Sequence, residues 1–161
     1  MVLDLGIKRE QKDLIDIITF GLFIILIGII FLFTPNLMNK VLIFFKDLEF
    51  RGYTSFIYLP YPKSEHPILF NTLYNFCLFF AIIHIPILAA RFILKDPIDK
   101  KTGAFSGLIF WFGAAYIINI LLEKNIDWRA FIGYLIVLIG ITLVINNSIK
   151  ISVYFARAGS R

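Results

Sequence analysis

Four long uncharged stretches alternate with charged segments along the chain. They run from Ile17 to Asn39, Pro67 to Ala90, Thr102 to Leu122 and Ala130 to Ile149, and each holds 20 to 24 residues. Because a helix rises 1.5 Å per residue, about 20 apolar residues cross the roughly 30 Å hydrocarbon core of a bilayer. Buried strands usually stop at about 4 to 8 residues, and the run ILIGIIFLF lacks the alternating polarity of a barrel strand. The pattern therefore predicts four membrane-spanning helices.

We expect these helices to form a four-helix bundle in an all-α membrane protein. The predicted spans cover about 14–36, 67–91, 103–123 and 129–150, within a single integral membrane domain of residues 1–161. Residues 37–66 then form an external segment. The last connection, Glu123 to Arg129, has only seven residues, which makes the third and fourth spans antiparallel neighbours and places Trp128 as an anchor at the membrane interface.

The external segment carries two different patterns. In KVLIFFKDLEF the apolar residues follow helical spacing, which predicts a short amphipathic helix in the membrane interface after the first span. After Gly52, the aromatic run YTSFIYLPYP is interrupted by Pro60 and Pro62, so we expect a short extended stretch at most. Aromatic rings suit the headgroup layer. The residues concerned are Val41, Phe44, Phe45 and Leu48 in the helix and Tyr53, Phe56, Tyr58 and Tyr61 in the aromatic run.

Composition supports a membrane protein. Of the 161 residues, 59% are hydrophobic and 17% are charged, against about 45 to 50% and 25% in an average soluble domain. This excess of apolar residues excludes intrinsic disorder and disfavours a soluble globule. Cys77 is the only cysteine, which excludes an intrachain disulfide and a cysteine metal cage. The composition, rich in Ile, Phe, Lys and Asn, suggests a prokaryotic source.

The net charge of +5 indicates topology rather than a nucleic-acid partner, because the basic residues lie between apolar runs and form no continuous patch. Ten Lys and Arg residues fall in the N-terminal segment, the second connection and the C-terminal tail, and six fall on the other side. The positive-inside rule then predicts a multi-pass protein of the cell membrane with both termini cytoplasmic. We expect four residues of the second connection to contact lipid headgroups: Arg91, Lys95, Lys100 and Lys101.

Small residues recur seven positions apart in three spans. This spacing places each pair on one helix face and allows close helix packing. The pairs are Gly21 and Gly28, Ser106 and Gly113, and Gly133 and Gly140. The segments around the first and last pairs are similar, which marks either an inverted repeat or the composition that two apolar helices share.

Few polar residues fall within the spans. His84 is the only histidine among them and precedes Pro86, which cannot donate to the carbonyl of Ile82 and is expected to kink the helix. An ionisable residue at such a place is a functional candidate in a membrane, although a neutral imidazole can also serve structure alone. His66 is 18 residues from His84, about 27 Å along a helix, so the two histidines cannot share a metal within one chain.

A second polar set lies toward the outer ends of spans two and three. Its members share helix faces and could line a polar cleft, or they could make ordinary bonds between helices worth about 1 kcal/mol each. They are Asn71, Asn75, Tyr116, Asn119 and Glu123.

No sequence motif assigns an activity. The HExxH, GxSxG and phosphate-loop patterns are absent, and no charged residue lies in the inner two-thirds of any span. We therefore expect no catalytic residue, cofactor or metal. The sequence favours a non-catalytic accessory, assembly or anchoring protein, whose partners are membrane lipids and other integral membrane subunits or a second copy of itself. The alternative is a small oligomeric channel or transporter with its path at subunit interfaces.

Overall fold

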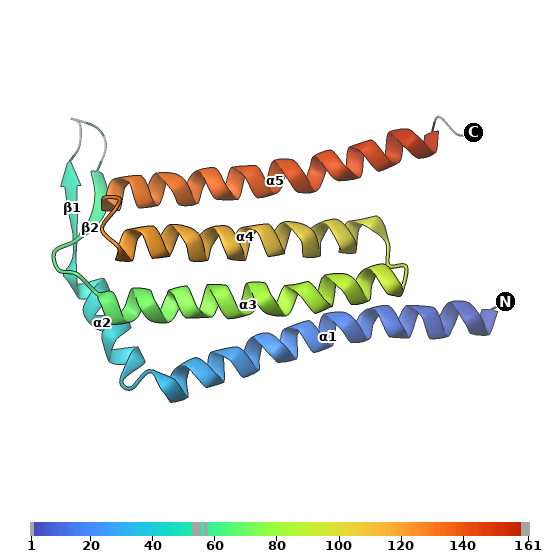
Figure 1. Ribbon diagram of the computed structural model, residues 1–161, viewed down its shortest axis with the longest axis horizontal. Helices are drawn as coiled ribbons and strands as arrows, with labels where there is room; N and C mark the ends of the chain where they lie inside the picture. The colour runs from blue at the N-terminus through green and yellow to red at the C-terminus, as the bar shows by residue number, and fades with distance from the viewer. Residues whose placement is uncertain (1, 53–55, 57, 159–161) are drawn as a thin grey trace.

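The computed structural model describes residues 2–52, 56 and 58–158, with side chains except those of residues 2–13 and 157. Tyr53, one of the rings expected at the interface, lies outside this part of the chain. The structure is mostly helical (Figure 1). Its four long helices are α1 (Val2–Phe33), α3 (Pro67–Ile93), α4 (Ile98–Leu122) and α5 (Trp128–Ala158).

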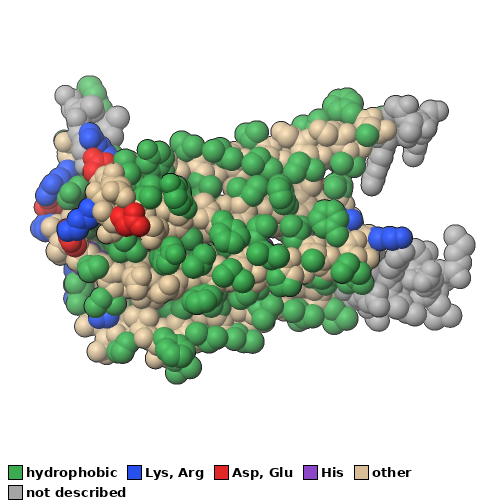
Figure 2. Space-filling model, in the orientation of Figure 1, with side chains coloured by type: hydrophobic (Ala, Val, Ile, Leu, Met, Phe, Trp, Pro, Cys, Tyr) green, Lys and Arg blue, Asp and Glu red, His purple; other side chains and the backbone are tan. Residues whose placement is uncertain are grey.

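All four long helices are apolar enough to cross a membrane, over Leu14–Phe33, Pro67–Ile93, Ile98–Leu122 and Trp128–Ala156. This confirms the predicted number of long apolar helices. Apolar side chains cover the middle of the molecule, and the charged side chains gather toward its two ends (Figure 2). Such a distribution fits a multi-pass membrane protein, because the hydrocarbon layer excludes charge.

The helices lie side by side in one layer, in the order α1, α3, α4, α5 (Figure 1). Helices α1 and α5 occupy opposite edges, whereas a closed four-helix bundle would bring the first and last helices into its common core. The buried share is accordingly 11% for the span in α1 and 17% for that in α5, against 33% and 28% for the middle helices α3 and α4. The packing thus differs from the predicted bundle, and both faces of the layer remain open.

The core of the layer lies between α3, α4 and α5. Small residues of α4, Ala114 and Ala115, let the neighbouring helices approach closely, and an added Cβ at Gly113 would lie 2.5 Å from Leu138 Cδ1 of α5. Helix α1 packs on α3 with Phe23, whose ring meets those of Phe76 and Phe80 edge to face, and its buried residues are Ile15 and Leu26. The buried core residues are Cys77, Ala114, Ala115, Ile117, Ile118, Phe131 and Leu138.

A helix and a hairpin connect α1 to α3. Helix α2 (Leu37–Asp47) follows a turn at Asn36, whose left-handed backbone (φ 56°) is one that asparagine tolerates. Strands β1 (Leu48–Gly52) and β2 (Tyr58–Pro62) then pair in antiparallel register, with Leu48 opposite Pro62 and Gly52 opposite Tyr58.

The hairpin corrects the all-α prediction. Leu48, Glu49 and Phe50 belong to β1 rather than to the predicted helix, and the extended stretch after Gly52 folds back on them. Two prolines are tolerated in β2 because each strand of a two-stranded sheet keeps one edge free, where no N–H is needed. The spacing of apolar residues along a helix does not predict this pairing, because it depends on residues of a second strand.

The layer has two ends, the hairpin end and the terminal end (Figure 1). The hairpin end holds α2, β1, β2 and the α4–α5 connection (residues 123–127). The terminal end holds the start of α1, the end of α5 and the α3–α4 connection (residues 94–97).

Candidate functional site

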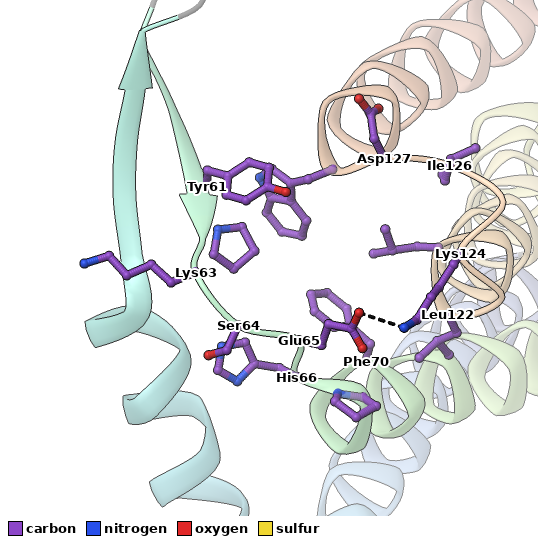
Figure 3. A pocket seen from close by; sticks show the side chains of 14 residues that line it. Tyr61, Lys63, Ser64, Glu65, His66, Phe70, Leu122, Lys124, Ile126 and Asp127 are labelled. Atoms are coloured by element: carbon purple, nitrogen blue, oxygen red, sulfur yellow. Dashed lines mark ion pairs between the residues drawn. The ribbon is translucent and has the colours of Figure 1, made fainter.

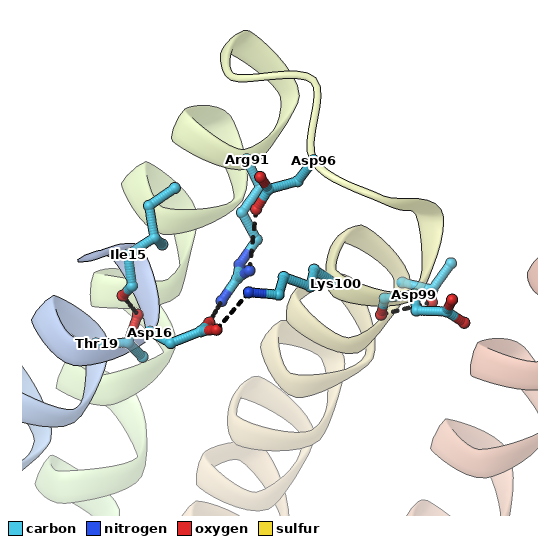
Figure 4. Close-up of polar contacts among 8 residues, drawn as sticks. Ile15, Asp16, Thr19, Arg91, Asp96, Asp99 and Lys100 are labelled. Carbon is cyan, nitrogen blue, oxygen red and sulfur yellow. Dashed lines mark hydrogen bonds and ion pairs between the residues drawn. The ribbon is translucent and has the colours of Figure 1, made fainter. Parts of the chain in front are cut away.

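An ion-pair network joins three elements at the terminal end (Figure 4). Arg91 of α3 donates from Nη1 to Asp96 Oδ2 (3.2 Å) and from Nη2 to Asp16 Oδ1 of α1 (2.6 Å). Lys100 of α4 donates to the other oxygen of Asp16 (2.6 Å). We call Asp16, Arg91, Asp96 and Lys100 the Arg91 network. It ties the edge helix α1 to both middle helices.

The centre of the Arg91 network is buried. The Arg91 side chain is 9% exposed and that of Asp96 is not exposed at all. Within the described residues, Arg91 Nε and Asp96 Oδ1 have no hydrogen-bond partner. The attraction between two buried charges can offset the free energy of removing them from water. Loss of either charge leaves the other buried without a partner. The pair is therefore a fixed element of the helix arrangement.

The four residues expected at lipid headgroups have different environments. Arg91 faces the protein because Asp16 and Asp96 meet it there, which differs from the expected role. Lys100 pairs with Asp16, and Lys101 Nζ lies 4.9 Å from the centre of the Phe92 ring. Lys95 is exposed in the connection itself. One further ion pair at this end, from Lys150 Nζ to Asp99 Oδ1 (3.3 Å), links α5 to α4.

His84 lies inside the layer, between α3 and α4. Its side chain is buried, Nδ1 lies 2.9 Å from the Phe80 carbonyl oxygen, and its ring meets the Phe80 ring edge to face at 4.6 Å. An added Cβ at Gly107 of α4 would lie 3.2 Å from His84 Nε2, so that glycine makes room for the imidazole. Helix α3 continues through Pro86. This packing suits a structural histidine.

The predicted polar cleft is not joined by hydrogen bonds. Glu123, which directly follows α4, accepts from Asn119 of α4 (2.7 Å) and from Asn125 of its own connection (2.9 Å). In the described part of the chain, no hydrogen bond links Asn71 or Asn75 of α3 to Tyr116, Asn119 or Glu123. Tyr116 is 67% exposed and Asn71 is also exposed, so both face away from the core.

The three pairs of small residues have different surroundings. Ser106 is buried and Gly113 contacts Leu138, so the pair on α4 lies in the interior. An added Cβ would meet nothing within 4 Å at Gly21 and Gly28 of α1 or at Gly133 and Gly140 of α5. Four of the six small residues therefore make no close helix contact within the part of the chain that the structure describes.

A cavity of about 410 Å³ opens at the hairpin end (Figure 3). It lies between the hairpin, the start of α3 and the α4–α5 connection. Glu65 and Lys124 form an ion pair across it, with Oε1 and Nζ 2.8 Å apart. The lining residues are Tyr61, Pro62, Lys63, Ser64, Glu65, His66, Pro67, Phe70, Leu121, Leu122, Lys124, Ile126, Asp127 and Trp128.

Two sets of polar contacts hold the walls of this cavity. Trp128 Nε1 donates to the Pro60 carbonyl (2.6 Å), which ties β2 to α5. Asp47 Oδ2, at the end of α2, accepts from the Ser64 hydroxyl (2.7 Å) and backbone amide (2.8 Å), and lies 2.9 Å from His66 Nε2. The Ser64 hydroxyl, with help from the amide and His66, lowers the pKa of Asp47 from 3.8 to about 2. The walls are thus fixed by the protein itself.

No local sequence pattern predicts these contacts. Asp47 and Ser64 are 17 residues apart, and Trp128 and Pro60 are 68 apart, so neither pair shares a local pattern. The aromatic and proline-rich run 58–62 indicates an interfacial segment but not which residues it contacts. Within the described residues, no three His, Cys, Asp or Glu side chains are grouped to hold a metal ion.

Comparison of the chain with family models, curated proteins and solved structures gives no match.

Proposed function

We propose that this chain is a non-catalytic accessory, assembly or anchoring protein of the membrane, which packs sideways against other membrane subunits or a second copy of itself. One observation carries the proposal: the glycine pairs on both edge helices face open space. Glycine in a membrane helix allows a neighbouring backbone to approach closely, and packing of this kind drives helix association in lipid. The edge helices have no such neighbour within the described chain at Gly21, Gly28, Gly133 and Gly140.

The open layer supports the same proposal. A helix buried on one side only has a second side for lipid or for a partner, and both edge helices are the least buried of the four. The Arg91 network and the α3–α4–α5 core fix the layer from inside, so a partner would meet a pre-formed surface. Pre-formed surfaces bind with a smaller loss of conformational entropy.

The proposed orientation places the terminal end in the cytoplasm of a prokaryotic cell. The larger number of Lys and Arg residues in the segments of that end supports this orientation. Helix α2 would then lie in the outer membrane interface, with the hairpin beside it. Cysteine accessibility at Lys63→Cys and Lys95→Cys tests the orientation: only the first should react with an impermeant reagent added outside, and the reverse result would contradict it.

Bulky substitutions at the edge glycines test the proposal. In full-length protein purified in mild detergent, Gly28→Leu and Gly140→Leu should each reduce co-purification of partner chains or self-association by about tenfold. A loss of 1.4 kcal/mol suffices for that. The control is Gly103→Leu on the middle helix α4, which also meets nothing within 4 Å. A wild-type chain that is strictly monomeric in native membranes, or equal association in all variants, would contradict the proposal.

An oligomeric channel or transporter is the second candidate, favoured by the exposed polar side chains of Asn71 and Tyr116. A single layer of helices encloses no aqueous path, so the path would lie between copies. His84 is buried within one chain and would not line it. Flux through reconstituted protein that is lost on Asn71→Leu or Tyr116→Phe but kept on His84→Ala would support this function over the first.

A further inference from the structure

The cavity at the hairpin end has the size and rigidity of a ligand site. Its volume of about 410 Å³ falls in the range of about 300 to 1,000 Å³ that small-molecule sites occupy. Trp128 and Asp47 hold its walls through bonds to Pro60, Ser64 and His66. The cavity therefore exists before any ligand enters, and binding need not order a loop.

Its charges are matched and easily displaced. Glu65 and Lys124 pair across the cavity (Figure 3), and their side chains are 72% and 71% exposed. An ion pair so exposed contributes little to stability and can open at small cost. A pure anion could bind Lys124 only by leaving Glu65 without its partner, and a pure cation would do the reverse. A ligand with both charges replaces both halves of the pair.

The remaining walls favour an ammonium group next to an apolar body. Phe70 and Trp128 line the cavity, and aromatic rings attract ammonium groups. The Tyr61 ring also lines it, with Arg51 Cζ 4.1 Å from the ring centre. Asp127 adds a carboxylate, whose pKa is lowered by the backbone amide of Ala130 and which also pairs with Arg129 Nη2 (3.2 Å), so it stays ionised at neutral pH. Leu121 and Ile126 give the cavity an apolar side.

The cavity also lies where lipid headgroups would be. Pro67 and Trp128 begin the membrane-spanning parts of α3 and α5, and Leu122 ends that of α4. All three residues line the cavity. It is thus at the level at which the apolar helices stop, and a lipid beside the layer would bring its headgroup to this height.

We infer that this cavity binds the zwitterionic headgroup of a phospholipid. The phosphate pairs with Lys124, and the amine pairs with Glu65 beside the aromatic wall. The start of the acyl chains lies along Leu121 and Ile126. The inference goes beyond the proposed function, since it needs no partner subunit.

Native mass spectrometry of the full chain tests the inference. The protein is released from mild detergent with phosphatidylethanolamine or with phosphatidylglycerol of the same acyl chains, and the retained lipid is counted. We expect phosphatidylethanolamine to be retained preferentially. Glu65→Gln and Lys124→Gln should each lower that preference about threefold to fivefold, the effect expected of one exposed ion pair. The exchanged pair Glu65→Lys with Lys124→Glu should restore it.

Matched controls make the outcomes distinct. Asp99→Asn removes a carboxylate that pairs with Lys150 at the opposite end of the layer, away from the cavity lining, and it should leave retention unchanged. Equal or better retention of phosphatidylglycerol, or wild-type retention in Glu65→Gln and Lys124→Gln, would overturn the inference. Acyl-free glycerophosphoethanolamine that binds as tightly as the lipid would overturn the lipid as occupant. Gly28→Leu should keep the lipid while losing partners, which separates this inference from the proposed function.

Discussion

One ion pair at each end of the helix layer shows how burial changes what a charge can do. At the terminal end, the side chains of Arg91 and Asp96 are 9% and 0% exposed, and Arg91 also pairs with Asp16 of the edge helix α1. At the hairpin end, Glu65 and Lys124 are more than 70% exposed and face each other across a cavity. The two ion pairs therefore have different roles. The buried pair fixes how the helices pack, whereas each residue of the exposed pair can bind a ligand in place of the other residue. The difference lies in the desolvation of the charges.

The largest test of this contrast removes Arg91. Arg91→Leu leaves Asp96 buried without its partner, and the free energy of unfolding should fall by about 3 to 5 kcal/mol. Unfolding by a denaturing detergent, followed by circular dichroism, measures the change. The double variant Arg91→Leu with Asp96→Asn should recover most of it, because no uncompensated charge remains. A loss as small as that of the exposed control Lys95→Gln would show that the network is not structural.

The next test loosens the hairpin end alone. Trp128→Phe keeps an aromatic ring in place but removes the N–H that Pro60 accepts, and should cost about 0.5 to 1.5 kcal/mol. Amide hydrogen exchange should rise in β1 and β2 and stay unchanged in the 94–97 connection. Faster exchange at both ends would mean that the two ends are coupled, which would contradict their separate roles.

Acid should act on the hairpin end through Asp47. Its pKa is lowered to about 2 in the folded protein from an ordinary value of 3.8, so the stability it contributes is complete above about pH 3.8. That stability is lost as the pH falls toward 2. The carboxyl carbon of Asp47, followed by NMR, should titrate near pH 2 in the wild type. Ser64→Ala should move the midpoint toward 3.8, and an unchanged midpoint would contradict the role of the Ser64 hydroxyl.

The smallest effect is expected at the exposed pair. Glu65→Gln should change the free energy of unfolding by at most about 1 kcal/mol, because solvent screens both charges. The same detergent unfolding that is used for Arg91→Leu gives a direct comparison. A loss of several kcal/mol would mean that Glu65 is a structural residue like Arg91.

Much of the fold could be predicted from local features. Uncharged stretches of 20 to 24 residues predicted four long apolar helices, and the structure has them. The prediction failed at Leu48 to Phe50, where a helical pattern continues but the chain enters β1. Their partners in β2, ten to fourteen positions further along the chain, decided that change, and a periodicity over a few residues contains no information about them.

The candidate site was less predictable. The sequence shows His84 as a lone ionisable residue within a span. It does not show that the space for the imidazole depends on Gly107 of the next helix. The residues that line the cavity with Trp128 come from the hairpin, the start of α3 and the α4–α5 connection. These segments are far apart in the sequence and meet only in the folded chain. Charge counts placed Arg91 among lipid-facing residues because sequence shows a charge but not its burial.

By itself, the sequence determined the number of apolar helices and the confinement of charge to their ends, because the transfer of an uncharged helix into hydrocarbon depends on its own residues. The tertiary structure decided the open layer, the burial of Arg91 and the cavity at the hairpin end. Each of these depends on which distant residues meet: Asp16 and Arg91 are 75 positions apart, and Pro60 and Trp128 are 68 apart. Such pairings follow from how the helices pack, and packing depends on all the helix surfaces together.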